Sequence, residues 1–261
     1  MRTLRAARGR VPVKTVREIA LMRESGRIVA ETLALVGTHI RPGVSTGELD
    51  RLAEEYIRSQ GGRPAFKGYG HDRANLFPGT LCVSVEDEVV HGIPDRRVLE
   101  EGQVVSVDVG VEKDEWYGDA AWSWPVGRVD AERLRLLRVT EEALALAVAE
   151  ARAGNRLHDI SWAVQRHVEA AGFSVVRDLV GHGIGRRLHE EPAVPNFGGP
   201  GTGIVLRAGM TLAIEPMVNA GGFEVEVAQD GWTVRTADRR PSAHFEHTVV
   251  VREGAADILT R

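Results

Sequence analysis

The sequence predicts an α+β protein of two related halves, each a helix pair packed on antiparallel strands. Helical stretches with capping residues alternate with strand-like stretches, and two pairs of segments look alike. VLEEGQVVSVD at 98–108 shares Val, Leu and Gly with VLRAGMTLAIE at 205–215, and an acidic residue closes both. ETLALVGTHIRPG at 31–43 resembles EALALAVAEARAG at 142–154, so the offsets are 107 and 111 residues. Nearly constant offsets indicate an internal repeat, with chance likeness between helix–strand segments as the alternative.

Composition narrows the class of protein. The 261 residues are 43% hydrophobic, enough for a sizeable core, and the net charge of −4 argues against DNA binding. Cys82 is the single cysteine, which excludes a disulfide framework and fits the reducing cytoplasm. No apolar run reaches membrane-spanning length, so no membrane association is expected. Residues 1–13 are interpreted as a basic tail before a single domain over 14–261, with a transit peptide or a contact with ribosomal RNA as alternatives.

The first half is expected to begin with two helices. The capping-box patterns TVRE at 15–18 and STGE at 45–48 mark their starts, and Gly61-Gly62 should end the second. Residues 63–80 have the composition of a loop. LCVSVEDEVV at 81–90 is expected to form one strand before the turn signal HGIPD.

A central hairpin is predicted over residues 103–124. Valines alternate with polar or small residues in its first arm, the two-residue period of a strand, and the second arm is rich in aromatic and small residues. A tight turn at Lys113-Asp114 would place Asp108 opposite Asp119 on one face. Facing carboxylates repel each other, so a bridging divalent cation is expected between them. A pair of solvated carboxylates at a sheet edge is the alternative.

The second half repeats the order of helices and strands. Helices are expected from about Asp130 to Ala153 and from about 158 to Gly172, each followed or ended by glycine. A strand, FSVVRDLV, should lead to the Gly-rich turn GHGIGRRLHEEP and then to a loop ending near 204. The remaining expected strands lie near 210–218, 223–228, 231–236 and 244–251.

The repeat brings acidic residues from both halves together. It places Glu215 where the first half has Asp108, and Glu246 projects from the last strand on the face opposite Phe245. Four acids would then converge: Asp108, Asp119, Glu215 and Glu246. Four buried negative charges would cost far more than the whole stability of a domain, about 5–15 kcal/mol, unless cations neutralise them. Two divalent cations cancel four carboxylates, and His182 and His189 could complete the coordination.

The ligand types indicate which metals and which chemistry to expect. Oxygen donors with one nitrogen suit Mn, Fe(II) or Co, although the usual affinity order also lets Zn bind. Two such ions activate a shared water for hydrolysis of peptides or phosphoesters. HExxH, a phosphate loop ending in Gly-Lys-Ser/Thr, and GxSxG are all missing from the sequence.

Seven segments together resemble a type I methionine aminopeptidase over about Lys14 to Val251. They are TVREIALMRESGRIVAETL, FKGY, CVSVEDEVVHGIPD, VVSVDVGVEKDEWYGDAA, LVGHGIGRRLHEEPAVPNF, TLAIEPMVN and DGWTVRTADRRPSAHFEHT. The resemblance implies the pita-bread fold and removal of the initiator methionine from nascent chains whose second residue is small. The expected partners are nascent peptide N-termini, with a transient ribosome contact as a further expectation. A cytoplasmic location is expected, and nothing in the sequence demands more than a monomer.

The resemblance also implies roles for particular residues. Asp108 would chelate one ion, Asp119 and Glu246 would bridge both, and His182 with Glu215 would complete the other. Glu215 would shuttle the proton of the attacking water, His189 would hydrogen-bond the scissile amide, and His91 would contact the peptide beyond it. The implied walls of the methionine pocket are Tyr69, Phe77, Cys82 and Trp232. The remaining histidines are expected to be surface or packing residues: 39, 71, 158, 167, 244 and 247.

Departures from the family pattern and two rival readings remain. The connection GYGHDRANLF, between Tyr69 and Phe77, is longer than usual by roughly five residues, and Leu188 occupies a position that is often aromatic in the family.

One rival is an aminopeptidase or dipeptidase acting before proline, a class that usually carries a large extra N-terminal domain. The other is a non-catalytic binding module with the same fold, which would have no need to keep all five metal ligands.

Overall fold

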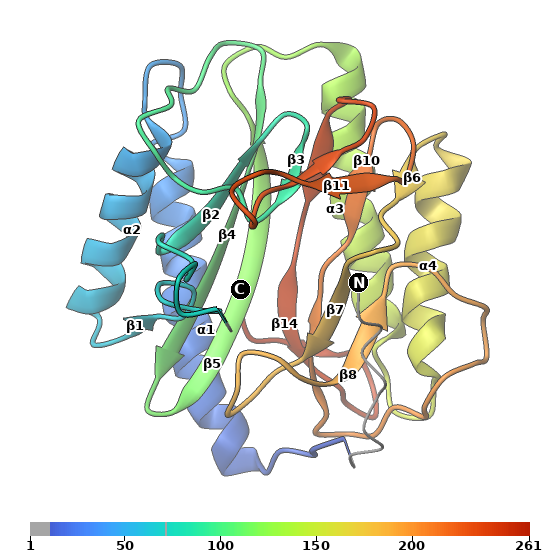
Figure 1. Ribbon diagram of the computed structural model, residues 1–261. Helices are drawn as coiled ribbons and strands as arrows, with labels where there is room; N and C mark the ends of the chain where they lie inside the picture. The colour runs from blue at the N-terminus through green and yellow to red at the C-terminus, as the bar shows by residue number, and fades with distance from the viewer. Residues whose placement is uncertain (1–10, 71) are drawn as a thin grey trace.

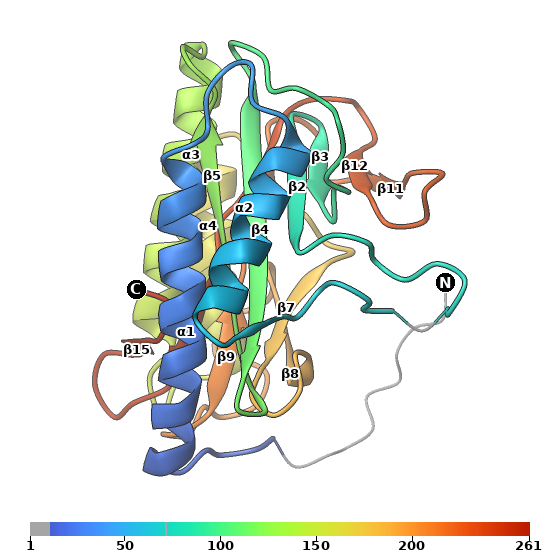
Figure 2. The ribbon, with the colours of Figure 1, turned by 90° about the vertical axis from the view of Figure 1, so that its left-hand side faces the viewer.

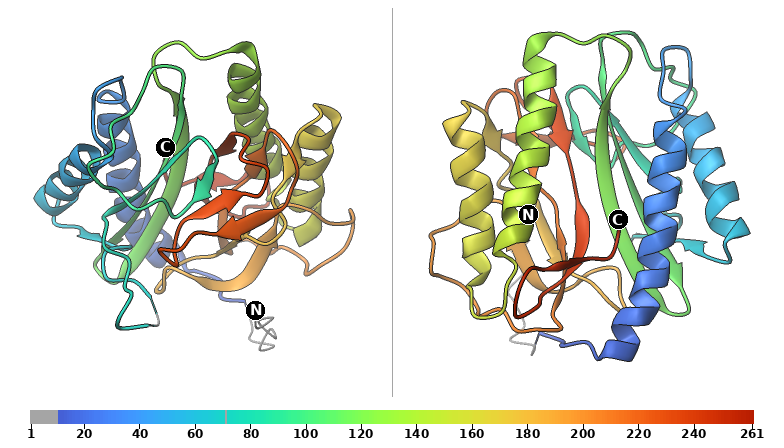
Figure 3. Two further views of the ribbon diagram at one scale, coloured as in Figure 1. Left: turned by 45° about the horizontal axis from the view of Figure 1, so that its top comes forward. Right: turned by 180° about the vertical axis from the view of Figure 1, so that it is seen from behind.

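The computed structural model describes residues 11–70 and 72–261. The helices cover one side of the molecule and the strands form its other side (Figures 1 and 2). Seen from behind, helices α1 and α3 lie next to the strands, and α2 and α4 lie outside them (Figure 3). The predicted basic tail, 1–13, falls mostly outside the described residues.

The elements follow one another in an order that nearly repeats. The helices are α1 (Val16–Gly37), α2 (Thr46–Ser59), α3 (Ala131–Glu150) and α4 (Leu157–Ala170). The strands of the first half are β1 (Arg63–Pro64), β2 (Leu81–Val85), β3 (Glu88–Val90), β4 (Val104–Lys113) and β5 (Trp116–Pro125). Those that follow α4 are β6 (Ser174–Val175), β7 (Val180–Gly183), β8 (Glu190–Pro195), β9 (Thr211–Ile214), β10 (Met217–Asn219), β11 (Val225–Val227), β12 (Val234–Thr236), β13 (Ser242–His244), β14 (His247–Val250) and β15 (Asp257–Ile258).

The helix starts agree with the capping patterns in the sequence. Thr15 and Ser45 cap α1 and α2, and in each case a Glu three residues later completes a capping box. Asp130 caps α3 by accepting a hydrogen bond from the backbone N–H of Arg133. Because a side-chain oxygen satisfies an otherwise unpaired N–H, these residues fix where each helix begins.

Matching hydrogen bonds confirm the two-half organisation. α2 and α4 both contain 14 residues, and each is preceded by a glycine with positive φ, Gly43 at 93° and Gly154 at 95°. The Gly43 N–H donates to the Leu99 carbonyl at 2.9 Å, and the Gly154 N–H donates to the Leu206 carbonyl at 3.0 Å. Leu99 and Leu206 open the segments that look alike in the sequence, so the repeat is structural.

The central hairpin forms, but its register differs from the predicted one. β4 and β5 pair over ten residues each, with Asp108 opposite Ala121 and Asp119 opposite Gly110. The turn lies at Asp114 and Glu115, whose φ angles of 51° and 65° match the twist of a two-residue hairpin loop. The shift is two residues, so both carboxylates keep the predicted face.

Several predicted strands are divided. LCVSVEDEVV folds back on itself at Glu86, whose φ is 58°, and gives β2 and β3 in place of one strand. The stretches 210–218 and 244–251 are likewise interrupted just before Pro216 and at Glu246, and β8 occupies part of the predicted loop before 204. Proline cannot donate to a ladder, which accounts for the break at 216. Each of these breaks contains an acidic residue, namely Glu86, Glu215 or Glu246.

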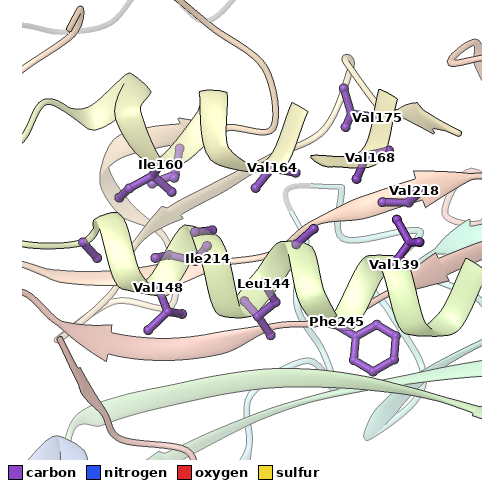
Figure 4. Close-up of a cluster of buried hydrophobic side chains, with 14 of the residues drawn as sticks. Val139, Leu144, Val148, Ile160, Val164, Val168, Val175, Ile214, Val218 and Phe245 are labelled. Carbon is purple, nitrogen blue, oxygen red and sulfur yellow. The ribbon is translucent and has the colours of Figure 1, made fainter. Parts of the chain in front are cut away.

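The cores lie between the helices and the curved sheets. In the second half, apolar side chains of α3 and α4 meet those of β6, β9 and β10, and Phe245 belongs to the same cluster (Figure 4). In the first half, α1 and α2 pack on the valines of β4, including Val105, Val107 and Val109. The alternating valines therefore place one face of β4 in the core and leave the other face for the cavity described below.

Helix α1 lies close to β5 and to the segment around Leu259 at Gly26. A Cβ built there would lie 2.3 Å from the Leu259 carbonyl oxygen, and a Cβ at Gly118 of β5 would lie 2.9 Å from the Gly26 nitrogen. We expect Gly26→Ala to lower the free energy of unfolding by about 1–3 kcal/mol, because overpacking outweighs the better helix propensity of alanine. Urea denaturation would measure this. Gly254→Ala, where a Cβ meets nothing within 4 Å, is the control and should change the stability little.

Candidate metal centre

One cavity collects all of the residues that the sequence singled out for function. Its volume is about 270 Å³, and its lining also includes Phe66, Val90, Asp178, Leu179, Val180, Leu188 and Met217. The sequence-predicted residues in its wall are Tyr69, Phe77, Cys82, His91, Asp108, Asp119, His182, His189, Glu215, Trp232 and Glu246. Residues from both halves of the chain therefore meet at one place.

The carboxylates reach the cavity from strands or strand ends of both halves. Asp108 and Asp119 belong to β4 and β5, Glu215 directly follows β9, and Glu246 lies between β13 and β14. Thr248 of β14 joins the two halves beside Asp119, since its hydroxyl donates to the Asp119 carbonyl at 2.8 Å and accepts from the Asp119 N–H at 3.0 Å. The edge of the second half is thus held against the hairpin of the first.

His182 stands among the acids. Its Nε2 lies 3.9 Å from Asp119 Oδ2 and 3.6 Å from Glu215 Oε1. Ligand atoms of Asp119, His182 and Glu246 all lie within 4.8 Å of one another. The His182 Nδ1–H donates to the Gly183 carbonyl at 2.9 Å. This hydrogen bond leaves the Nε2 lone pair directed at the acids, the arrangement that metal-ligating histidines adopt.

Unpaired oxygens show that the donor set fits divalent cations. Asp108 Oδ1, Asp119 Oδ1 and Glu246 Oε1 are buried and have no hydrogen-bond partner among the residues that the structure describes. A buried unpaired carboxylate oxygen is costly unless a cation meets it. Oxygen donors with one imidazole are the ligands that Mn, Fe(II), Co and Zn accept. The residues present therefore fit a metal centre.

Burial perturbs every titratable group in this centre. It raises the pKa of Asp108 to about 7, and it raises the pKa of Asp119, Glu215 and Glu246 well above the usual carboxyl range, with further contributions from the neighbouring acids. Burial, assisted by the nearby His189, lowers the pKa of His182 to about 3. Without a cation the carboxyls hold protons near neutral pH, whereas His182 is already neutral and ready to coordinate.

These pKa values predict that metal binding releases protons. A carboxyl with a pKa of about 7 is protonated below that pH, and the metal binds the deprotonated form, so affinity should fall as the pH drops below about 7. Calorimetric titration of metal-free protein with Mn(II), at pH 6 in two buffers of different ionisation enthalpy, should give about one or more protons released per chain. Equal heats in the two buffers, meaning no proton release, would contradict the assignment of these acids.

His189 lies beside His182 but is held differently. The ring centroids are 4.2 Å apart, and His189 Nδ1 lies 2.7 Å from the Tyr69 hydroxyl. When the phenol donates to Nδ1, the ring proton sits on Nε2, which can then donate to a bound molecule. His91 also lines the cavity, in the left-handed region at φ 59°, and burial lowers its pKa to about 4.

His244 is a buried neighbour of the acids. It was expected to be a surface or packing residue on the face of Glu246, and its side chain is buried with Nε2 3.8 Å from Glu215 Oε2 and 4.0 Å from Glu246 Oε2. That Nε2 has no hydrogen-bond partner within the described residues. The signal in the sequence was its position two residues before Glu246, on the same face of an alternating strand.

Apolar side chains form the remaining walls. Phe77 and Cys82 are almost fully buried, whereas Tyr69 is 38% exposed at the rim. The ring of Trp232 meets Phe77 edge-on, with centroids 5.3 Å apart. Burial also raises the pKa of the Cys82 thiol well above its usual value, so Cys82 contributes a neutral, polarizable surface.

Fold and site together define a metallopeptidase, and comparison with known families agrees. The family model described as metallopeptidase family M24 matches residues 20–253, and the chain belongs to this family. Methionine aminopeptidase 1 of Bacillus subtilis is 51% identical over 248 residues, covering 95% of this chain and 98% of that protein. Methionine aminopeptidase of Escherichia coli K12 is 45% identical over 252 residues, covering 96% and 94%.

Solved structures confirm the predicted pita-bread fold. The crystal structure of methionine aminopeptidase from Thermotoga maritima superimposes with a TM-score of 0.93 at 47% identity, covering 97% of this chain and all of that one. Prolidase from Pyrococcus furiosus gives a TM-score of 0.75 at 21% identity, covering 95% of this chain and 65% of that one. The prolidase likeness reflects the fold alone.

Within residues 11–70 and 72–261, no helix has the length and apolar character that a membrane crossing requires.

Proposed function

We propose that this protein is a methionine aminopeptidase that removes the initiator methionine from nascent chains whose second residue is small. The observation that carries the proposal is the convergence of four acids and His182 from both halves in a cavity with apolar walls. The names of the relatives, at 45–51% identity over nearly the whole chain, point to the same substrate. The site is that of a metal-dependent aminopeptidase.

We assign two divalent ions to the centre, because two dications neutralise four carboxylates. Asp108 would chelate one ion, Asp119 and Glu246 would hold both, and His182 with Glu215 would complete the second. Co, Mn, Fe(II) and Zn all suit these ligands. When bound, such ions supply Lewis acidity, which lowers the pKa of a water toward neutrality.

The protein's own side chains would then handle protons and position the peptide. Glu215 Oε1 lies 3.6 Å from His182 Nε2, at the edge of the donor set, where it can take the proton of the attacking water and return it to the leaving amine. His189, held at Nδ1 by Tyr69, would direct its Nε2–H to the scissile amide and stabilise the developing negative charge. His91 would contact the peptide beyond the scissile bond.

The apolar part of the cavity would receive the methionine side chain. Phe77, Cys82 and Trp232 present aromatic and sulfur surfaces, which suit a flexible thioether, and Tyr69 stands at the rim. A volume of about 270 Å³ has room for one side chain and the adjoining backbone. This fit supports methionine over a larger or charged first residue.

The proposal is tested by supplying metal to the metal-free protein. Protein refilled separately with Mn(II), Fe(II), Co(II) and Zn(II) should release methionine from Met-Ala-Ser with at least one of them. Cleavage of Xaa-Pro peptides alone would assign the chain to the prolidase-like activity, and a stable protein that takes up no metal would support a binding module instead. Metal content by mass spectrometry separates the last outcome from a merely inactive enzyme.

The setting of the reaction follows from its substrate. Nascent chains carry their initiator methionine in the cytoplasm, where we place the enzyme. A monomeric state and a transient ribosome contact stay predictions. Sedimentation of the purified protein would test the first, and sedimentation of the protein together with ribosomes would test the second.

A further inference from the structure

The long connection between Tyr69 and Phe77 leaves its two ends fixed. The Gly68 N–H donates to the Phe77 carbonyl at 2.8 Å, and the Phe77 N–H donates to the Tyr69 carbonyl at 2.8 Å. These bonds close the connection at its base and hold the backbone of Tyr69 and Phe77 together. In Figure 2 the segment after β1 projects away from the helices, toward the side on which β11 and β12 lie.

Asn75 in this connection is bound to the turn before β12 through both its backbone and its side chain. Its carbonyl accepts a hydrogen bond from Trp232 Nε1 at 3.2 Å. Its side-chain Nδ2 donates to the Asp230 carbonyl at 3.1 Å. One residue therefore ties the connection to the indole of Trp232 and to the backbone that carries this indole.

Asp230 makes the other side of this contact rigid. Its Oδ1 accepts from the N–H groups of Trp232 at 2.8 Å and of Thr233 at 2.9 Å, and its Oδ2 accepts from the Thr233 hydroxyl at 2.6 Å. The carboxylate therefore fixes the backbone on which Trp232 stands, while the Asp230 carbonyl faces Asn75. The turn presents a preformed partner to the connection.

Two glycines allow the close approach. A Cβ at Gly231 would lie 2.8 Å from Asn75 Nδ2, and a Cβ at Gly70 would lie 3.2 and 3.3 Å from two carbons of the Trp232 ring. Their φ angles, 79° and 138°, are also ones that glycine adopts readily. Packing and backbone geometry at these positions thus agree with the hydrogen bonds.

We propose that Asn75 is a positioning residue that determines specificity: its side chain, anchored on the Asp230 carbonyl, holds in place the backbone carbonyl that accepts from the Trp232 indole, and so fixes one wall of the cavity for the substrate's first side chain. This inference rests on the proposed function. Nε1–H is the only polar group of the indole. A ring rotation would break its bond to Asn75 and the edge-on contacts with Phe77 and His91, whose ring centroids lie 5.3 and 6.5 Å away. A fixed wall favours the unbranched thioether of methionine over the branched side chain of leucine.

The test uses Asn75→Ala and the shape-matched Asn75→Asp, neither of which can donate to the Asp230 carbonyl. Both keep the backbone carbonyl that accepts from the indole, so they remove only the anchor that holds this carbonyl in place. Each Mn(II)-loaded variant is compared on Met-Ala-Ser and Leu-Ala-Ser. We expect KM for Met-Ala-Ser to rise about three- to tenfold while kcat stays within about twofold, the effect of losing one hydrogen bond outside the reacting atoms. The preference for methionine over leucine in kcat/KM should fall by a similar factor.

A second readout follows the indole directly. Solvent exchange of the Trp232 Nε1–H, assigned as the ¹⁵N-HSQC signal that Trp232→Phe removes, should accelerate several-fold in both Asn75 variants. Arg73→Ala is the control, because Arg73 is exposed in the same connection and has no side-chain hydrogen bond to the described residues. Selectivity and indole exchange that match the control would overturn the proposal. Should the wild-type protein not cleave Met-Ala-Ser, the proposed function fails, and unchanged indole exchange would still reject the role of Asn75.

Discussion

Replacing Asp108 with Asn is expected to lower kcat for Met-Ala-Ser by about 100-fold or more, because the amide is a far weaker ligand for a divalent cation than the carboxylate. The side chain keeps its shape and its place in β4, so the fold should survive when metal is present. Metal content and steady-state kinetics, measured on the same preparation, would check both parts of the expectation.

Asp114→Asn is the matched control for this change. Asp114 lies in the turn of the same hairpin, at φ 51°, a conformation that asparagine also tolerates. The control should retain both metal and activity. Wild-type kcat in Asp108→Asn would show that this carboxylate does not hold a catalytic ion.

His189→Ala is expected to slow turnover by about 10²–10³-fold while leaving the metal content unchanged. The reason is that His189 Nδ1 is engaged by Tyr69, whereas His182 stands among the acids with its Nε2 free. Loss of a group that acts in the transition state lowers kcat and kcat/KM together. Stopped-flow or steady-state kinetics with parallel metal analysis would provide the measurement.

Two further variants make this result interpretable. His167→Ala removes a half-buried histidine that contacts Glu142 on the helical side, far from the cavity, and it should leave activity and metal content unchanged. Tyr69→Phe removes the hydroxyl that orients His189 and should give a smaller loss in the same direction. If His189→Ala empties the site of metal, the division between ligand and catalytic histidine is wrong.

Much of the architecture could be predicted because short sequence patterns mark the helix starts and the internal repeat. Side-chain caps fixed the helix starts at Thr15, Ser45 and Asp130 within the chain itself, without help from tertiary contacts. The repeated Val-Leu and glycine pattern indicated two equivalent halves, and Leu99 and Leu206 do make equivalent hydrogen bonds. The convergence of the four acids could be predicted from this repeat and from the alternation of side chains along the strands.

The parts that could not be predicted depend on tertiary contacts or on single backbone angles. Residues such as Glu86 and Glu115 adopt positive φ, which their side-chain types do not indicate. For this reason 81–90 was expected to be one continuous strand, and the hairpin register was predicted two residues away from the observed one. The proximity of His244 to Glu215 could not be predicted, because the two side chains meet only after separate strands pack. The contact between Asn75 and Trp232 joins segments far apart in the chain, and no pattern in the sequence indicates it.

The proposed donors to the centre are spread from residue 108 to residue 246, and the last of them directly precedes β14. Synthesis proceeds from the N-terminus, so a growing copy of this protein cannot assemble its centre until Glu246 has emerged. Every peptide trimmed while such a copy is being made must be trimmed by an older, finished molecule.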